Sequence, residues 1–183
     1  EERTVRRLRK AYLEITNVCN LACDFCPGTR RVPGFLSPEG FRTLAGRLRP
    51  HTDYLYLHLM GEPLLHPQLG VLLEEADALG FRVMLTTNGT LLRQREALEK
   101  VSVSVHSFEG NGGAGEDLEG YLDGCIAFAR AAAGAGKRCA LRLWNLDGAE
   151  TEGANRQNGQ ILSRLREAFP GPWRSDRRGT TLA

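Results

Sequence analysis

Three cysteines within eight residues are the part of this sequence best equipped for chemistry. They are Cys19, Cys23 and Cys26, in the stretch ITNVCNLACDFCPGT (residues 15–29), and they follow a short apolar run. Three thiols at this spacing could form a disulfide, bind zinc, hold an iron–sulfur cluster or have no chemical role. The rest of the sequence narrows these alternatives.

The number and placement of the cysteines argue against a disulfide framework. The chain of 183 residues has five cysteines, an odd number, and three of them crowd into one loop. This pattern favours a reducing compartment, so we expect a cytoplasmic protein. A structural zinc site commonly uses two ligand pairs, but Cys125 and Cys139 lie 14 residues apart. Three thiolates leave a metal position open, which suits an iron–sulfur cluster that binds a substrate or cofactor.

The composition is that of an ordinary soluble domain. Apolar residues make up 42% and charged residues 25% of the chain, and the net charge is +2. Basic residues cluster at both ends without interleaved aromatic residues, which indicates solvated termini rather than a nucleic-acid surface. No apolar run is long enough to span a membrane, and no signal peptide is recognisable. We therefore expect neither a membrane nor a nucleic acid as partner.

Strand-like and helix-like segments alternate along the chain. Strands are expected at 11–16, 54–60, 81–87, 101–107 and 138–144, and helices at 37–48, 68–80, 91–99, 118–134 and 158–169. Ser37 followed by Pro38 is typical of a helix start, and Gly80 of a helix end. Five β–α units in succession predict an α/β fold with a parallel sheet, either doubly wound or a partial or complete barrel.

The predicted strands have one aliphatic and one polar face. The aliphatic faces carry Leu13 and Ile15, Leu55, Leu57 and Leu59, Val101, Val103 and Val105, and Leu141 and Leu143. The opposite faces carry polar residues such as Glu14, His58, Ser104 and Arg142. A sheet with helices on both sides would be apolar throughout, so the polar faces favour a lumen that holds a polar ligand. Arg142 would need a carboxylate there, from Glu14 or from the ligand.

The cysteine array resembles the C-x3-C-x-Φ-C motif of the radical S-adenosylmethionine (radical SAM) superfamily, with Phe25 in the aromatic place. Like the family motif, it follows the first strand. The stretch MGEPLLHP (60–67) resembles the Gly-Glu motif that receives the methionine amino group of SAM, although Met60 replaces the first glycine. TTNGTLL (86–92) is similar to the family's turn after the third strand. The resemblance extends over residues 11–145.

The resemblance implies cofactors and the residues that hold them. Cys19, Cys23 and Cys26 would bind a [4Fe–4S] cluster. The contacts to SAM would come from Phe25 near the adenine, Gly61 and Glu62 at the amino group, Ser104 or His106 at the ribose, and Arg142 or Asn145 at the carboxylate or ribose. The reduced cluster would cleave SAM to methionine and a 5′-deoxyadenosyl radical, which would abstract hydrogen from a substrate.

The family core is a (β/α)6 partial barrel of the TIM type, of which about five units are expected here. Residues 1–183 would then form one radical SAM core domain, incomplete at its C-terminus, and some similar cores continue into a SPASM/twitch-like region with auxiliary clusters. The expected partners are a small-molecule or peptide substrate and an electron donor such as flavodoxin or ferredoxin. The alternative is a zinc- or cluster-binding module without radical catalysis, and a fourth ligand such as Cys139 or His106 would favour it.

Overall fold

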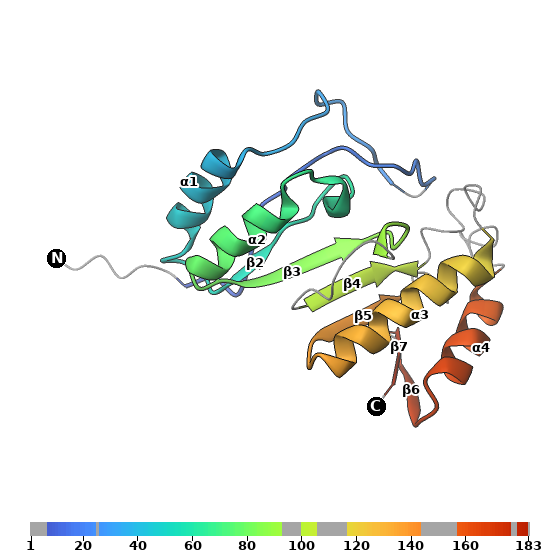
Figure 1. Cartoon of the computed structure of the whole chain (residues 1–183). Coiled ribbons are helices and arrows are strands. Elements are labelled where there is room, and N and C mark those ends of the chain that lie inside the picture. Colours follow the sequence, from blue (N-terminus) through green and yellow to red (C-terminus); the bar gives the residue numbers. More distant parts are fainter. Residues whose placement is uncertain are drawn as a thin grey trace. The chain divides into compact units, whose positions relative to one another are not determined.

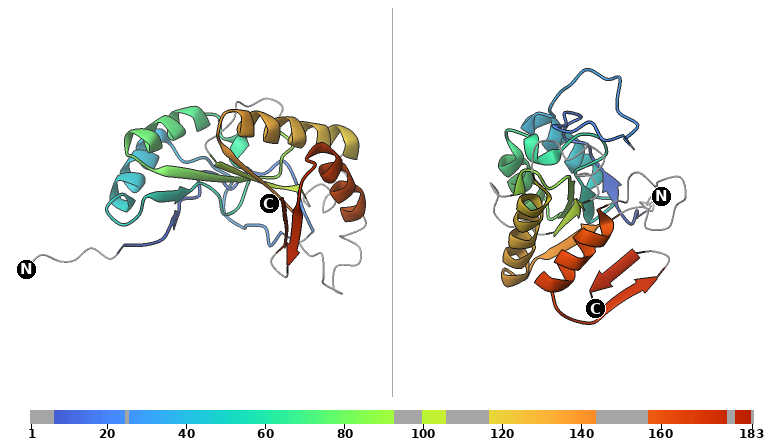
Figure 2. Two further views of the ribbon diagram at one scale, coloured as in Figure 1. Left: turned by 90° about the horizontal axis from the view of Figure 1, so that it is seen from below. Right: turned by 90° about the vertical axis from the view of Figure 1, so that its right-hand side faces the viewer.

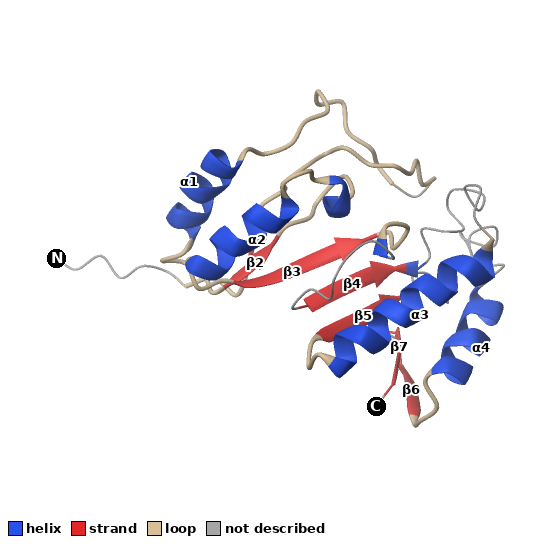
Figure 3. Cartoon of the chain, in the orientation of Figure 1, coloured by secondary structure: helices blue, strands red, loops and turns tan. Residues whose placement is uncertain are grey.

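The computed structural model describes residues 7–24, 26–92, 100–105, 117–143, 157–176 and 179–182, which contain both helices and strands (Figure 3). The chain divides into two compact units. The first comprises Glu1–Asn20, Pro27–Thr87 and Leu98–Ser102, and the second comprises Leu21–Cys26, Asn88–Ala97 and Val103–Ala183. Each unit is described by itself below.

Five strands form one sheet in the order of the chain (Figure 1). They are β1 (Ala11–Tyr12), β2 (Tyr54–Tyr56), β3 (Arg82–Thr87), β4 (Lys100–Ser104) and β5 (Arg138–Arg142). β1 pairs with β2 and β2 with β3 in parallel, which requires crossover connections of the kind that helices provide. The predicted α/β class and parallel sheet are confirmed. The sheet is not closed, which fits a partial rather than a complete barrel.

The first unit contains two helices and a short 3-10 helix. α1 (Pro38–Leu48) begins after Ser37, whose Oγ accepts a hydrogen bond from Gly40 N at 3.1 Å, and Pro38 occupies its first turn. The 3-10 helix η1 (Pro63–Leu65) and α2 (Leu69–Ala78) follow β2. The predicted helix starts and ends agree with the structure to within one or two residues, whereas η1 was not predicted.

The aliphatic strand face of the first unit is its core. α1 and α2 lie on one side of β2 and β3 (Figure 2). Phe41 and Ala45 of α1 and Leu72 of α2 are fully buried, as are Leu55 and Leu57. Each large apolar side chain buried in this way contributes about 1.5–3 kcal/mol. The two-faced pattern of the sequence therefore identifies the side of these strands that the helices cover.

The opposite strand face carries tyrosines and cations. Tyr12 and Tyr56 are paired residues of β1 and β2, and their ring centroids lie 4.9 Å apart. Lys10 Nζ lies 5.0 Å from both ring centroids. Tyr12 and Tyr54 are 41% and 38% exposed. In the first unit this face is thus polar and aromatic, as the alternation of residue types predicts.

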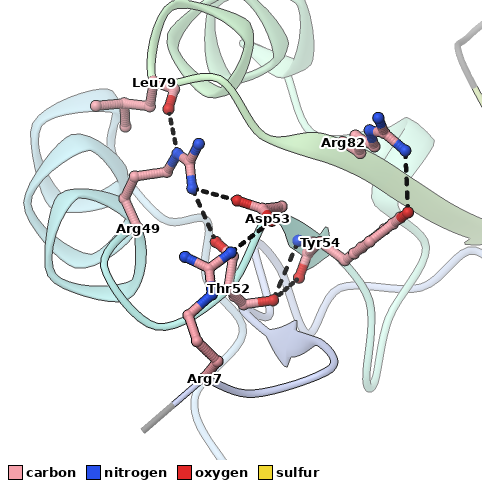
Figure 4. A network of polar contacts seen from close by, with 7 residues as sticks. All are labelled: Arg7, Arg49, Thr52, Asp53, Tyr54, Leu79 and Arg82. Atoms are coloured by element: carbon pink, nitrogen blue, oxygen red, sulfur yellow. Dashed lines mark hydrogen bonds and ion pairs between the residues drawn. The ribbon is translucent and has the colours of Figure 1, made fainter. Parts of the chain in front are cut away.

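A polar network fixes the beginning of β2. It comprises Arg7, Arg49, Thr52, Asp53, Tyr54, Leu79 and Arg82 (Figure 4). The carboxylate of Asp53 receives Arg7 Nη2 and Arg49 Nη1, each at 2.5 Å, and these hydrogen bonds hold the pKa of Asp53 below its ordinary value. Arg49 Nε also donates to Leu79 O at 2.7 Å. The network therefore joins the ends of α1 and α2 to the start of β2.

Strands β1 and β2 are shorter than predicted by about four residues each, and β4 and β5 also end before their predicted ends. β1 ends at Tyr12, because Ile15 C=O accepts from Leu36 N, at 2.8 Å, instead of continuing the sheet. β2 ends at Tyr56, although Leu57 N still donates to Met84 O at 3.0 Å. Leu59 is 61% exposed, so its predicted place on the buried aliphatic face is wrong. After Leu57 the chain leaves the sheet to form the turn described below.

The second unit is built around α3 (Leu118–Gly134), which begins at Asp117, and α4 (Asn158–Ala168). Arg164 of α4 joins the two helices, with Nη2 at 2.8 Å from Asp123 and Nε at 3.3 Å from Glu119. Leu122, Ile126 and Ile161 are among the buried residues of this unit.

The C-terminal stretch forms a hairpin that was not predicted. β6 (Trp173–Asp176) and β7 (Gly179–Leu182) pair in antiparallel fashion, with Trp173 opposite Leu182 (Figure 2). Residues 93–99, which make up most of the predicted helix 91–99, lie outside the described residues. Among the residues that are described, no helix combines the length and apolarity needed to cross a membrane.

Candidate cofactor site

The cysteine loop, here residues 19–31, begins and ends at two segments that are paired with each other. We call these segments, residues 15–18 and 32–36, the clasp. Thr16 forms an antiparallel bridge with Phe35 across it. All residues of the clasp belong to the first unit. The clasp therefore fixes the two ends of the cysteine loop next to each other.

Side chains of the clasp strengthen the pairing. Asn17 Nδ2 donates to Val32 O at 3.0 Å, and Asn17 Oδ1 accepts from Gly34 N at 2.8 Å. Thr16 Oγ1 donates to Gly34 O at 2.9 Å and accepts from Val18 N at 3.0 Å. Asn and Thr commonly bond nearby backbone in this way, and here they do so across the base of a loop. The residues directly before Cys19 are thereby held in one conformation.

The three cysteines have the donor chemistry that an iron–sulfur cluster requires. Cys19 belongs to the first unit and is exposed. Cys23, half-buried, and Cys26, exposed, belong to the second unit and form one turn, in which Cys26 N donates to Cys23 O at 3.0 Å. None of the three is in a disulfide. Accessible thiols in a short loop fit the predicted cluster.

The structure does not by itself assemble a metal site. Within the described parts of the chain, no three His, Cys, Asp or Glu side chains are arranged to hold a metal ion. The assignment of Cys19, Cys23 and Cys26 as cluster ligands therefore stays a prediction.

The Gly61–Glu62 turn is docked on the backbone just before the cysteine loop. Gly61 has φ +75°, and a Cβ added to it would lie 2.7 Å from Thr16 O and 2.8 Å from Val18 O. Only glycine fits such a close approach at a positive φ. Glu62 N donates to Val18 O at 2.8 Å. Two motifs more than forty positions apart in the sequence are thus joined by direct backbone contact.

The Glu62 carboxylate is buried, with 1% of the residue exposed. Its Oε1 accepts from Leu64 N at 2.9 Å, so Glu62 acts as the N-cap of η1, with Pro63 at the first helical position. The cap fixes the side-chain position relative to the turn. The predicted contact of Glu62 with the amino group of SAM is not tested by this geometry.

Glu14 connects the first strand region to both motifs. Its Oε2 accepts from Met60 N at 2.9 Å, and its Oε1 lies 2.7 Å from Arg31 Nη1. Burial raises the pKa of Glu14, but the hydrogen bonds from Arg31 and from Met60 N–H outweigh burial and lower it below the ordinary value. Glu14 is therefore ionised at neutral pH. The sequence offered Glu14 as a partner of Arg142, and the structure pairs it with Arg31.

Of the remaining residues predicted to contact SAM, the structure describes Ser104 and Arg142. Ser104 is half-buried on β4, and Arg142 is exposed at the end of β5. Both belong to the second unit. Phe25, His106 and Asn145 lie outside the described residues.

The turn after β3 is ordered by local bonds in the second unit. Asn88 Oδ1 accepts from Thr90 N at 3.0 Å, and Tyr121 of α3 donates its hydroxyl hydrogen to Asn88 O at 2.6 Å. Gly89 has φ +87°, and a Cβ there would lie 2.8 Å from Val103 Cγ1. This matches the expectation that TTNG forms a turn after the third strand.

The residues that shape the site were partly missed by sequence reasoning. Thr16 and Asn17 were not assigned a role, although their types favour local backbone bonds beside Cys19. Glu14 was identified as a polar residue, but its contacts with Arg31 and Met60 were not foreseen. No spacing rule connects residues 17 or 46 positions apart.

An open parallel α/β sheet, with a three-cysteine loop after its first strand and a glycine-glutamate turn after its second, defines a class of cofactor-binding proteins with a partial barrel. The sequence profile described as "Radical SAM superfamily" matches residues 13–108, just over half of the chain. The chain belongs to this family. The resemblance drawn from the cysteine and glycine-glutamate motifs is confirmed.

Curated relatives share about a third of their residues with the chain where they align. The AdoMet-dependent heme synthase of Oleidesulfovibrio alaskensis is 32% identical over 89 residues, which cover 47% of this chain and 23% of the relative. The GTP 3′,8-cyclase of Parasynechococcus marenigrum is 34% identical over 158 residues. This alignment covers 69% of this chain and 45% of the cyclase. The chain therefore spans less than half the length of these relatives.

Solved structures share the fold. SuiB of Streptococcus suis bound to S-adenosylmethionine superimposes with a TM-score of 0.62 at 16% identity, over 89% of this chain and 39% of SuiB. BtrN in complex with AdoMet and 2-DOIA superimposes with a TM-score of 0.57 at 24% sequence identity. The match covers 75% of this chain and 58% of BtrN. At this level of identity the likeness concerns the architecture alone.

Proposed function

We propose that the chain is the core of a radical SAM enzyme, and that residues 1–183 form one core domain. Cys19, Cys23 and Cys26 would ligate a [4Fe–4S] cluster with one iron open for SAM. When bound, the cluster and SAM supply a 5′-deoxyadenosyl radical that abstracts hydrogen from the substrate.

One observation supports the proposal most strongly. The Gly61–Glu62 turn is hydrogen-bonded to Val18, the residue before Cys19. A ligand bound at Cys19 would therefore lie near the residue proposed to receive its amino group. The carboxyl oxygens of Glu62 are hydrogen-bond acceptors that suit a protonated amine.

The other SAM contacts are assigned by residue chemistry. Phe25 offers a ring for the adenine. Ser104 or His106 offers hydrogen bonds for the ribose, and Arg142 or Asn145 for the carboxylate or ribose.

The substrate is proposed at the level of its class, as a small molecule or a peptide. Relatives are named for different products, among them a heme synthase and a GTP 3′,8-cyclase. SuiB has been solved with its precursor peptide SuiA. We further propose a flavodoxin or ferredoxin as electron donor, because the cluster must be reduced before each cleavage.

Anaerobic reconstitution tests this function. Chain loaded with iron and sulfide, reduced and given SAM should release 5′-deoxyadenosine, and Cys23→Ala should release none. A wild-type chain that takes up one zinc ion and shows no charge-transfer absorbance would contradict the proposal and favour the metal-binding module.

Cys139→Ala is the matched control. Cys139 lies on β5, outside the motif, and burial raises the pKa of its thiol to about 11, so it stays protonated at neutral pH. The variant should keep its iron and its activity. Loss of metal in Cys139→Ala would identify Cys139 as a fourth ligand and contradict the open position.

A further inference from the structure

We propose that Glu14 is a positioning residue that holds the Gly61–Glu62 turn and the closing end of the cysteine loop in one arrangement. The inference rests on the proposed function, since it concerns how the cluster ligands and SAM contacts are presented. Glu14 is not assigned a contact with either cofactor. It acts through Met60 and Arg31.

The two carboxylate oxygens of Glu14 have different partners. Oε2 accepts from Met60 N at 2.9 Å, and Oε1 is paired with Arg31 Nη1 at 2.7 Å. The Glu14 side chain is only 13% exposed, against 59% for Arg31. A shielded carboxylate that uses both oxygens cannot rotate without breaking a charge-assisted bond. Glu14 is therefore a rigid anchor for two other segments.

The contact with Met60 secures one end of the turn. Met60 directly precedes Gly61, and the other end is secured by the bond from Glu62 N to Val18 O, at 2.8 Å. Without the Glu14 carboxylate, the turn loses the bond that secures its Met60 end. The position of Glu62 should then be less well defined.

The contact with Arg31 secures the end of the loop. Arg31 is the last residue before the clasp, and its Nε also donates to Thr29 Oγ1 at 3.1 Å. The ion pair with Glu14 therefore extends the ordered region from the clasp back into the loop that carries the cysteines. One side chain thus connects both motifs.

Three substitutions separate the two contacts. Glu14→Met removes both. Glu14→Gln keeps an acceptor for Met60 N–H but loses the charge that pairs with Arg31. Arg31→Gln removes the ion pair, together with the bond from Arg31 Nε to Thr29 Oγ1, and keeps the contact of Glu14 with Met60. The matched control is Arg42→Gln, which breaks another Arg–Glu pair, with Glu75, between α1 and α2.

Amide hydrogen exchange in the metal-free chain is the first measurement. The informative amides are Glu62 N–H and Leu36 N–H, because their own partners, Val18 and Ile15, are unchanged. Glu14→Met should speed exchange at both by about tenfold or more, and Arg31→Gln should affect Leu36 more than Glu62. Glu14→Gln should lie between wild type and Glu14→Met, and Arg42→Gln should match wild type.

SAM affinity of the reconstituted chain is the second measurement. At equal iron content, Glu14→Met should weaken the Kd for SAM by about tenfold, the size of effect typical of residues that orient ligands. Glu14→Gln should weaken SAM binding less than Glu14→Met does. If Glu14→Met fails to fold, the Glu14→Gln variant still tests the proposal.

Two outcomes would overturn the proposal. Wild-type exchange at Glu62 and Leu36 in both Glu14 variants would mean that Glu14 positions neither segment. Equal loss of SAM affinity in Arg42→Gln would mean that the effect is general destabilisation. If the wild-type chain binds no SAM, the proposed function fails, while the exchange measurement still decides the role of Glu14.

Discussion

Because Gly61 has no side chain, the Gly-Glu motif can pack directly against the backbone that precedes the cysteine motif. Its positive φ and its close approach to the carbonyl oxygens of Thr16 and Val18 leave no room for a Cβ. The neighbouring Glu62 depends on the same contact, because its N–H bonds Val18 O. The glycine in the Gly-Glu motif therefore has a steric role that is separate from any contact with a cofactor.

Gly61→Ala should both destabilise the chain and weaken SAM binding. A methyl group 2.7 Å from a backbone oxygen forces the turn away from the clasp, and the positive φ adds strain, so we expect a loss of about 1–3 kcal/mol in the free energy of unfolding. Urea unfolding and SAM titration measure the two effects.

The control for Gly61→Ala is Gly46→Ala. Gly46 lies in α1, where an added Cβ meets nothing within 4 Å. Replacing an unstrained helical glycine should stabilise the chain by about 0.5–1 kcal/mol. Equal effects of the two substitutions would mean that the contact of Gly61 with the clasp is unimportant.

At the scale of elements, His66 joins the segment before α1 to the start of α2. The residue is 1% exposed. Its Nδ1 accepts from Gln68 N at 3.1 Å, so Nε2 carries the hydrogen and donates to Leu36 O at 2.9 Å. Burial lowers the pKa of His66 below its ordinary value of 6.5, and the bond to Leu36 only partly opposes this.

The chain should therefore lose stability as the pH falls below about 6.5. In the unfolded chain His66 binds a proton below this pH, whereas in the folded chain it stays neutral to lower pH, so its contribution is complete above pH 6.5 and declines below it. His66→Phe, which cannot titrate, should be less stable at pH 7.5 by about 1–3 kcal/mol.

The slope of stability with pH is the decisive measurement for His66. Urea unfolding at pH 7.5, 6.5 and 5.5 should show a steeper decline for wild type than for His66→Phe. If the two decline in parallel, other groups control the acid sensitivity and His66 does not.

At the scale of the whole molecule, the proposed cofactor contacts come from segments far apart in the sequence. They extend from Cys19 to Gly61 and Glu62 and on to Ser104 and Arg142. A cofactor that needs contacts so distant in sequence would bind the folded chain and not the unfolded one. Its binding free energy then adds to the stability of the whole chain.

SAM should stabilise the cluster-loaded chain against unfolding. At a concentration one hundred times its Kd, SAM should add about 2.7 kcal/mol. Thermal unfolding under anaerobic conditions measures this effect. The gain should be much smaller in the metal-free chain, which lacks the open iron, and smaller in Glu62→Gln, which keeps a capping oxygen for Leu64 N. Equal gains in all three would contradict the proposed binding mode.

The local elements of this protein could be predicted from its sequence. Helix α1 follows from Ser37, Pro38 and its apolar spacing, and the buried strand faces follow from alternation at Leu55 and Leu57. The family and the candidate ligands follow from cysteine spacing and the Gly-Glu motif. Helix caps, strand alternation and motif spacing all depend on residues close together in the sequence, so short-range physical rules are enough to predict them.

The connections between elements were decided only by the tertiary structure. β1 and β2 end early, Leu59 is exposed, and β6 pairs with β7, because each outcome depends on contacts between segments that alternation does not encode. The clasp and the partners of Glu14 likewise require that residues 15 to 46 positions apart meet. Cysteine spacing and the Gly-Glu motif, both local in the sequence, predict which residues carry the chemistry, whereas the fold decides which distant backbone groups hold those residues in place.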